Sequence, residues 1–351
     1  MKKRLLLICG LAMMLGLTAC GGKKETKEET KDKIVVETEV QAEKEARPEL
    51  PEGQMYSYLT GEPVEEEVGT QRPFAIMINN IDEALPQAGI CQADIVYECL
   101  VEGNITRMLG LFQNFEGIER IGSVRSARHY YMDLAKDDEA IFTHFGQSIF
   151  AEDRINQGYQ TISGLSGYSD AVFYRAADRY APHDVFTTED GLMAGLDYTG
   201  LTREYSENYE GRLNFYNEDT TPEGSDANVI TMPFSYASPW FEYDAEAGLY
   251  NRYQYGGAHV DDQGEQLKFK NLVIQYAERS VISDEDHQDF ALIGEGEGLI
   301  ITNGKAVKIR WERPTEADRT TYYYEDGSYA LLNCGHSYIA VVPTETPVVI
   351  E

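Results

Sequence analysis

The sequence predicts an α+β fold, in which a layered α/β sandwich domain is followed by a mainly antiparallel, β-rich domain. Two observations support this expectation. Apolar segments alternate with capped helices in the first half, whereas the second half has β-rich segments joined by the turn pairs Asn303-Gly304 and Asp326-Gly327. A polar connector at 204–211 separates the two patterns. We therefore expect domains at residues 48–205 and 206–351.

The first half is expected to mix strands with helices. A two-residue turn at 103–104 joins two strands into a hairpin. Ser126 is the predicted N-cap of one helix, and Thr187 or Thr188 caps another, which ends near Gly195. The expected strands lie at 74–78, 94–102, 105–113 and 140–143. The helix that begins at Ser126 is expected to run to about residue 136, and a further helix is expected at 147–157.

The second half carries stronger β signals. The Asn-Gly pair joins the segment GLIIT to KAVKIRW, and the Asp-Gly pair joins TTYYYE to SYALL. Both pairs favour the left-handed backbone of a two-residue hairpin loop. Further strands are expected at 272–276 and 338–342, and the Gly-rich segment 294–298 is expected to be a turn.

The first residues have the features of a bacterial lipoprotein signal peptide. Basic residues at 2–4 precede a short apolar segment, and LTAC at 17–20 matches a lipobox. The apolar segment is shorter than the ~20 residues that a membrane-spanning helix needs. We expect residues 1–19 to be removed and the Cys20 thiol to carry a diacylglycerol. This lipid would anchor the protein to the outer face of the cytoplasmic membrane.

Residues 20–47 are predicted to be a disordered tether, because they are rich in Lys and Glu and contain no aromatic side chain. This segment is nearly neutral, whereas the whole chain has a formal net charge of −30. Most of the negative charge therefore follows Arg47, which argues against nucleic acid as a partner. Any site for an anion must be a local cluster of positive side chains.

The hairpin predicts one positive position held by acids. With a two-residue loop, Arg107 shares a sheet face with Asp94, Glu98 and Glu102. These carboxylates would hold Arg107 towards a ligand, or shift one another's pKa for acid–base chemistry. The alternative is a purely structural charge network on a partly exposed sheet.

A second group of positive residues lies in the segment ERIGSVRSARHYYMD. Arg125, Ser126 and Arg128 stand at the expected start of a helix, where free N–H groups and guanidinium groups suit a phosphate, sulfate or carboxylate. The alternative is that these arginines pair with nearby acids. The candidate anion site consists of Arg107, Arg125, Ser126, Arg128, His144 and His183.

The sequence predicts neither a metal nor a cofactor. No Cys-x-x-Cys pair is present, so we expect buried, unpaired thiols at Cys91, Cys99 and Cys334. His259 and Asp261 could ligate a metal with Asp262, but adjacent ligands without a further one favour a loop histidine paired with an acid. No catalytic residue is assigned.

Several motifs resemble the YerB-like family of Gram-positive lipoproteins. They are RPFAIMINN, PQAGICQADIVYECLVEGNITRMLGLF, IGSVRSAR, HFGQS, FYRAADRYAPHDVF, YNRYQYGGAHVDDQGEQLKFKNLVIQ and NGKAVKIRW. The resemblance covers nearly the whole chain after about Tyr58. It implies two successive domains of unknown function, an α/β sandwich architecture and no established reaction. The recurrent polar positions of the family fall on Arg107, Arg125, Ser126, Arg128, His144, Pro182, His183 and His259.

The chain departs from the family pattern near this candidate site. His129 stands where Pro is usual, Gln147 where a small residue is usual, and Asp184 where Asn is usual. We therefore do not extend chemistry shared by the family beside these positions to this chain.

Two functions are compatible with these features. One is a non-enzymatic lipoprotein that binds an anionic envelope component, such as a cell-wall glycan, or a membrane-protein partner. The other is a phosphotransferase or hydrolase acting on a phosphorylated envelope glycan or polyprenyl phosphate, since the order of elements in the first half loosely resembles the LytR-CpsA-Psr phosphotransferases. The sequence shows neither clustered carboxylates for a metal nor a nucleophile beside its base, which favours binding.

Overall fold

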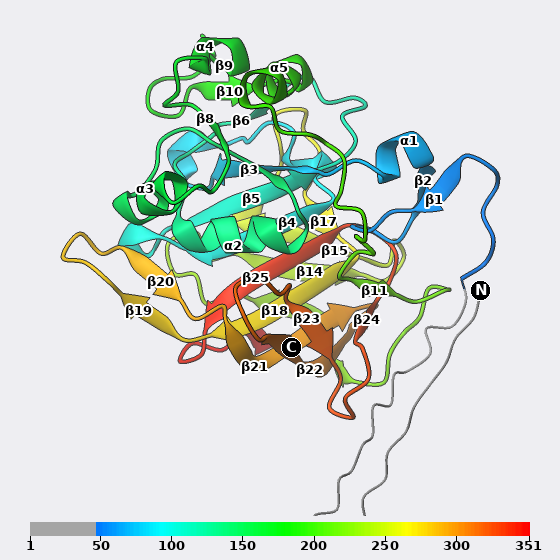
Figure 1. Ribbon diagram of the computed structural model, residues 1–351. Helices are drawn as coiled ribbons and strands as arrows, with labels where there is room; N and C mark the ends of the chain where they lie inside the picture. The colour runs from blue at the N-terminus through cyan, green and yellow to red at the C-terminus, as the bar shows by residue number, and fades with distance from the viewer. Residues whose placement is uncertain (1–46) are drawn as a thin grey trace, which may run out of the picture. The chain divides into compact units, whose positions relative to one another are not determined.

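The computed structural model describes residues 47–351. Its central element is a mixed sheet of eleven strands (Figure 1). Its strand order is β12 (Ser225–Asp226), β22 (Lys305–Arg313), β21 (Gly294–Thr302), β18 (Asn271–Ala277), β25 (Ser337–Pro343), β4 (Ile95–Leu100), β5 (Thr106–Phe112), β3 (Phe74–Asn79), β7 (Ile141–His144) and β8 (Ile162–Ser163), with β23 (Thr321–Tyr323) paired to β22. The signal peptide, Cys20 and most of the predicted tether lie outside the described residues.

Both halves of the sequence contribute to this sheet. β25 from the second half pairs in parallel with β4 from the first, and Ala340 lies opposite Glu98. β18 is parallel to β25, whereas β21 and β22 continue the sheet in antiparallel pairs. The hydrogen-bonded sheet is therefore continuous across the sequence boundary near residue 205.

A second, antiparallel sheet packs on one face of the central sheet. It consists of β16 (Gly257–Ala258), β15 (Leu249–Gln254), β14 (Trp240–Asp244), β13 (Val229–Thr231) and β26 (Val349–Ile350), with β17 (Lys268–Phe269) paired to β15. Phe241 and Phe269 of this sheet approach Tyr338 of β25 with ring centroids 4.8 and 5.5 Å away. These aromatic side chains are buried, so they fill the space between the two sheets.

The opposite face of the central sheet is covered by α2 (His129–Asp137), as Figure 1 shows. Tyr130 and Tyr131 of this helix are buried against β4. The Tyr130 hydroxyl donates to the Leu100 carbonyl at 2.6 Å, and the Cys99 N–H donates to the Tyr131 hydroxyl at 2.9 Å. The helix is thus held on the sheet by both apolar burial and hydrogen bonds to the strand backbone.

The remaining elements are short and lie around these layers. The helices are α1 (Glu66–Gly69), α3 (Ile149–Asn156), α4 (Ser169–Val172) and α5 (Glu189–Thr199). The small sheets are β1 (Gln54–Tyr56) with β2 (Pro63–Glu65), β6 (Ile121–Gly122) with β10 (Val185–Thr187) and β9 (Phe173–Arg175), β11 (Asn214–Phe215) with β24 (Leu331–Leu332), and β19 (Arg279–Val281) with β20 (Gln288–Phe290). Within residues 47–351, none of the helices is long and apolar enough to cross a membrane.

The mixed α and β composition agrees with the expected fold class, and most expected elements are present. Asn303 and Gly304 have positive φ angles and join β21 to β22, as predicted. Thr188 caps α5 by accepting from the Gly191 N–H, but the helix continues past Gly195 and ends only at Thr199. The expected turn at 294–298 is wrong, because this segment pairs residue by residue with β22 and forms part of β21.

Three buried ion pairs connect the two halves. In each, an arginine of the second half contacts an acid of the first half, and all six side chains are at most 2% exposed. Because removing water from a charge is costly, each buried arginine depends on its partner. The pairs are Arg212–Asp138 at 3.0 Å, Arg252–Glu98 at 2.8 Å and Arg313–Asp137 at 3.5 Å.

We predict that Arg252→Leu lowers the free energy of unfolding by about 3–5 kcal/mol, because it leaves the Glu98 carboxylate buried without a counter-ion. Urea unfolding followed by tryptophan fluorescence measures this change. The control is Arg310→Leu on β22, which removes an arginine whose side chain is 42% exposed and should cost less than about 1 kcal/mol. Equal unfolding midpoints for the two variants would contradict a structural role for the buried pair.

Candidate functional site

Three arginine side chains, Arg107, Arg125 and Arg128, lie close together where β5 meets the segment before α2. We call them the arginine cluster. Nη1 of Arg107 donates to the Ser126 carbonyl oxygen at 2.7 Å, and Nη1 of Arg128 approaches the same oxygen at 3.5 Å. Burial and the neighbouring arginines lower the pKa of Arg107, and burial with Arg128 lowers that of Arg125. The three cations thus repel one another at short range.

Only one carboxylate pairs with the arginine cluster among the described residues. Glu102 accepts from Arg128 through both of its oxygens, at 2.6 Å from Nε and 2.5 Å from Nη2. Arg107 and Arg125 donate to backbone carbonyl groups and have no carboxylate within ion-pair distance in residues 47–351. The cluster therefore keeps two positive charges without a counter-ion in the described part of the chain, which makes it a candidate site for an anion.

His183 lies beside this cluster. Nη1 of Arg125 donates to the Pro182 carbonyl oxygen at 3.1 Å, and the Asn79 amide donates to Nδ1 of His183 at 2.9 Å. Since Nδ1 accepts, the neutral ring carries its proton on Nε2. Burial and the Arg125 charge lower the pKa of His183. Nε2 has no hydrogen-bond partner among the described residues, so its N–H is available as a donor.

Ser126 contributes a hydroxyl at the same place. This hydroxyl makes no hydrogen bond to another described residue. The Ser126 carbonyl oxygen, in contrast, accepts hydrogen bonds from Arg107 and Arg128. Gly146, with a φ of +87°, approaches it closely, and a Cβ at that position would lie 2.5 Å from Ser126 Oγ. The absence of a side chain at Gly146 therefore leaves room for the hydroxyl.

His144 is not available to a ligand of the arginine cluster. It is fully buried on β7, and both ring nitrogens have internal partners. Nδ1 donates to the Gly146 carbonyl at 2.7 Å, and Nε2 accepts from the Thr161 hydroxyl at 3.0 Å. Burial lowers the pKa of His144 to about 4, so the ring is neutral and structural at ordinary pH.

The predicted support of Arg107 by Glu98 is wrong. The hairpin loop is a 3-10 turn over Glu102–Asn104, and Arg107 lies opposite Cys99 instead of Leu100. A shift of one residue in register moves a side chain to the other face of a sheet. Glu98 therefore faces the six-stranded sheet, where it pairs with Arg252.

The other two predicted carboxylates also have different partners. Glu102 holds Arg128 instead of Arg107. Asp94 lies just before β4, at the far end of the strand from the hairpin loop, and accepts from the Gln113 N–H at 2.9 Å. The length of β4 places Asp94 roughly 20 Å from the loop, so Asp94 does not belong to the candidate site.

The prediction that Ser126 caps a helix is wrong. Helix α2 begins at His129, and Arg128 occupies the N-cap position without a side-chain capping bond. The preceding residues are held extended, because the Arg125 N–H donates to the Met77 carbonyl and the Ala127 N–H donates to that of Gly146. Guanidinium and side-chain donors, and not the free N–H groups of a helix, define this candidate site.

The other sequence expectations concern metals and thiols. His259 is buried, and it contacts Arg252 through Nδ1 and Gln87 through Nε2 at 2.6 Å. The prediction that His259 pairs with an acid is therefore wrong. The described residues contain no group of three or more His, Cys, Asp or Glu side chains that could hold a metal ion. The thiols of Cys91, Cys99 and Cys334 are unpaired, as expected, but only Cys99 is buried, because Cys91 and Cys334 lie partly exposed.

Sequence reasoning missed Asn79, which orients the His183 ring. The one sequence feature that could have indicated Asn79 is its position at the end of the apolar strand in RPFAIMINN, because side chains at strand ends often meet loops. Its contact with a histidine more than a hundred positions away is a product of the fold.

The buried carboxyl group of Asp94 should make the stability of the protein depend on pH. Burial raises the pKa of Asp94 to about 6, above its ordinary value of 3.8. Because the folded state binds the proton more tightly, the free energy of unfolding should fall as pH rises from about 4 to about 6. Asp94→Asn keeps an acceptor for the Gln113 N–H and should be more stable than the parent above pH 6, by on the order of 2 kcal/mol.

Urea unfolding at pH 4 and pH 7.5 measures this difference. Asp226→Asn is the control, because Asp226 is 77% exposed on β12 and its substitution should change stability little at either pH. A loss of stability in Asp94→Asn at pH 7.5 would show that the carboxylate is stabilising as an anion.

Comparison with known proteins places this structure in a family. Residues 59–202 match the domain described as "Protein of unknown function (DUF3048) N-terminal domain", and residues 230–339 match its C-terminal counterpart. YerB of Bacillus subtilis (strain 168), whose name describes it as a candidate lipoprotein, is 29% identical over 294 residues, which are 81% of this chain and 85% of YerB.

The fold agrees with this relationship. The crystal structure of YerB from Bacillus subtilis superposes with a TM-score of 0.73 at 28% identity, and the match covers 84% of this chain and 99% of that chain. The two matched domains follow each other in the order expected from the sequence motifs. This chain belongs to the YerB-like family, whose two successive domains have no known function.

Proposed function

We propose that this protein is a lipoprotein, anchored through Cys20 at the outer face of the cytoplasmic membrane, that binds an anionic component of the cell envelope. The signal-peptide features of the first twenty residues and the name of the Bacillus relative support the anchor. The observation that carries the binding proposal is that Arg107 and Arg125 lie together without a carboxylate partner among the described residues.

The chemistry of the cluster suits a phosphate or carboxylate group. Arg125 and Arg107 provide guanidinium donors, and the Ser126 hydroxyl and the Nε2–H of His183 provide neutral ones. Charge-assisted hydrogen bonds from guanidinium groups are stronger than neutral ones, and partial burial increases them further. Glu102 compensates one arginine only, so a single anionic group would still meet excess positive charge.

Binding is better supported than catalysis. His144 has no free nitrogen, and no hydrogen bond joins the Ser126 hydroxyl to a histidine among the described residues. A nucleophile activated by a neighbouring base is therefore not formed at the cluster. No group of acids in residues 47–351 is arranged for a metal that could assist phosphoryl transfer. An anionic envelope glycan is the partner class that we favour.

We predict that Cys20→Ala abolishes membrane anchoring, because the thiol that would carry the diacylglycerol is lost. Fractionation of cells followed by immunoblotting should find the variant in the medium, or as an unprocessed precursor. A Cys91→Ala variant, which lacks a thiol of the folded region, should remain with the membrane. Membrane-bound Cys20→Ala at the mature size would contradict the lipid anchor.

We predict that Arg125→Ala weakens binding of inorganic phosphate by about tenfold or more, because it removes a charged donor that no carboxylate of residues 47–351 neutralises. Isothermal titration of the full-length protein in detergent micelles measures this loss. The control is Arg310→Ala, which removes an arginine of β22 that pairs with Glu295 and does not belong to the arginine cluster. This variant should bind phosphate like the parent.

The same protein should also be incubated with purified peptidoglycan and with undecaprenyl-phosphate-linked glycan, with and without Mg²⁺. Retention of intact glycan by the parent and its loss in Arg125→Ala would support the proposal. Turnover of either substrate that depends on Arg125 would replace the binding function with an enzymatic one. Equal phosphate affinity in both arginine variants would show that the cluster is not the anion site.

A further inference from the structure

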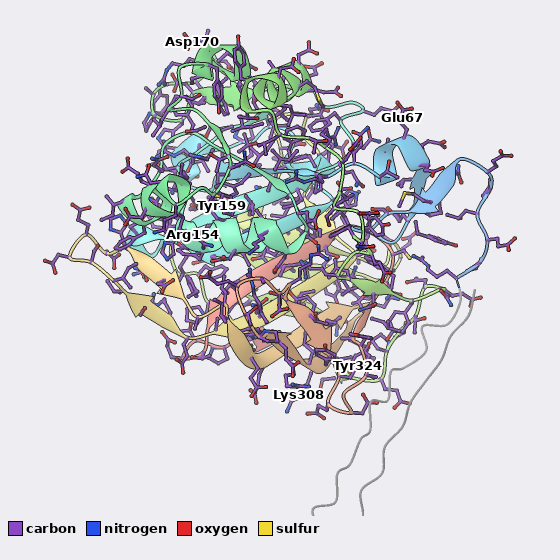
Figure 2. The ribbon with its side chains drawn as sticks, viewed as in Figure 1. Glu67, Arg154, Tyr159, Asp170, Lys308 and Tyr324 are labelled. Atoms are coloured by element: carbon purple, nitrogen blue, oxygen red, sulfur yellow. The ribbon has the colours of Figure 1, made fainter. Side chains whose placement is uncertain are left out.

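A cavity of about 400 Å³ opens far from the arginine cluster, between β11, the loop after β23 and the first described residues. Its wall includes Leu213, which follows the arginine that pairs with Asp138 at the end of α2. The arginine cluster lies at the other end of this helix. In Figure 2, Tyr324 of the cavity is well separated from Arg154, whose Nη1 reaches the His129 carbonyl at the start of α2.

Aromatic rings dominate the lining of this cavity. Several of them are fixed by their own contacts: the Tyr216 and Tyr324 hydroxyls are 2.9 Å apart, and the Arg47 guanidinium lies 3.5 Å from the centre of the Tyr56 ring. We call this site the tyrosine cavity. Its aromatic residues are Tyr56, Tyr58, Phe215, Tyr216, Tyr324 and Tyr329.

Polar groups without partners share the tyrosine cavity. The side-chain amides of Asn214 and Asn217, the Tyr58 hydroxyl and the Glu210 carboxylate all line it. None of these four groups makes a hydrogen bond to another residue in the described part of the chain. Their polar atoms are also not fully buried, so they remain accessible. Fixed rings and free hydrogen-bonding groups therefore face the same space.

The lining disfavours two other classes of ligand. Among residues 47–351, the charged side chains of the cavity wall are Arg47 and Glu210, so their formal charges balance and an anion gains no net attraction. The Arg47 guanidinium also lies on the Tyr56 ring and donates to the Gly61 carbonyl at 2.8 Å. Leu213 and Leu331 are the only aliphatic side chains that the described residues contribute to the wall, so an acyl chain or an apolar peptide would contact few methyl groups there. A neutral ligand with both apolar faces and hydroxyl groups fits this wall.

We propose that the tyrosine cavity binds a neutral segment of an oligosaccharide. The apolar C–H faces of sugar rings stack on aromatic rings, and sugar hydroxyl and acetamido groups exchange hydrogen bonds with amides and a carboxylate. The volume is within the range of about 300–1,000 Å³ that is usual for small-molecule sites. This site is independent of the anion site proposed above, because the two share no residue.

The test uses full-length protein in detergent micelles, with N-acetylchitotetraose and maltotetraose as neutral probes. Saturation-transfer NMR and isothermal titration should show binding of at least one of them. Tyr216→Ala should weaken this binding about tenfold, because it removes a stacking ring. The control is Tyr198→Ala, which removes a tyrosine that is 62% exposed and stacked on Tyr168 away from the cavity, and which should bind like the parent.

Asn217→Ala provides a second variant should Tyr216→Ala fail to fold, because the Asn217 side chain makes no hydrogen bond to the described protein. It should also weaken oligosaccharide binding while leaving inorganic phosphate binding unchanged. The proposal is overturned if neither oligosaccharide binds the parent protein, if Tyr198→Ala and the cavity variants weaken binding equally, or if inorganic phosphate competes with the oligosaccharide.

Discussion

The ion pair between Glu98 and Arg252 is the interaction on which the arrangement of the two halves depends. The Glu98 carboxylate is fully buried and accepts four hydrogen bonds, from Asn80 at 3.0 Å, Thr106 at 2.5 Å, Arg252 at 2.8 Å and Tyr338 at 2.8 Å. Two of these donors belong to each half of the sequence. Losing the counter-ion would leave the Glu98 carboxylate buried and unpaired, so the packing of the six-stranded sheet over β4 keeps this charge compensated.

The same network reaches the candidate anion site. Arg252 contacts His259, His259 binds Gln87 at 2.6 Å, and Gln87 donates to the Asn79 carbonyl at 2.9 Å. The Asn79 amide then orients His183 beside the arginine cluster. A histidine of the first half is therefore positioned by an arginine of the second half through a continuous series of hydrogen bonds. In this chain, residues from both matched domains therefore help to position the candidate site.

Local signals predicted much of the fold, and non-local contacts account for what they missed. Turn and cap residues such as Asn303 and Thr188 act within a few positions, so β21–β22 and the start of α5 followed from the sequence. The hairpin before Arg107 shows the limit, because one extra residue in its turn reversed the face on which Arg107 lies. No local pattern pairs Glu98 with an arginine 154 positions away, so its role could not be predicted.

The strong negative charge of the chain changes how an anionic partner can be bound. A formal net charge of −30 repels a polyanion at long range, whereas the arginine cluster attracts one of its groups only at close range. At physiological ionic strength, charges separated by more than about 8–10 Å are largely screened. Moderate salt therefore reduces the repulsion over the surface more than the contact at a partly buried guanidinium group. Anchoring through Cys20, as proposed, would add a high local concentration of membrane-linked glycan, which offsets slow association without requiring a basic surface.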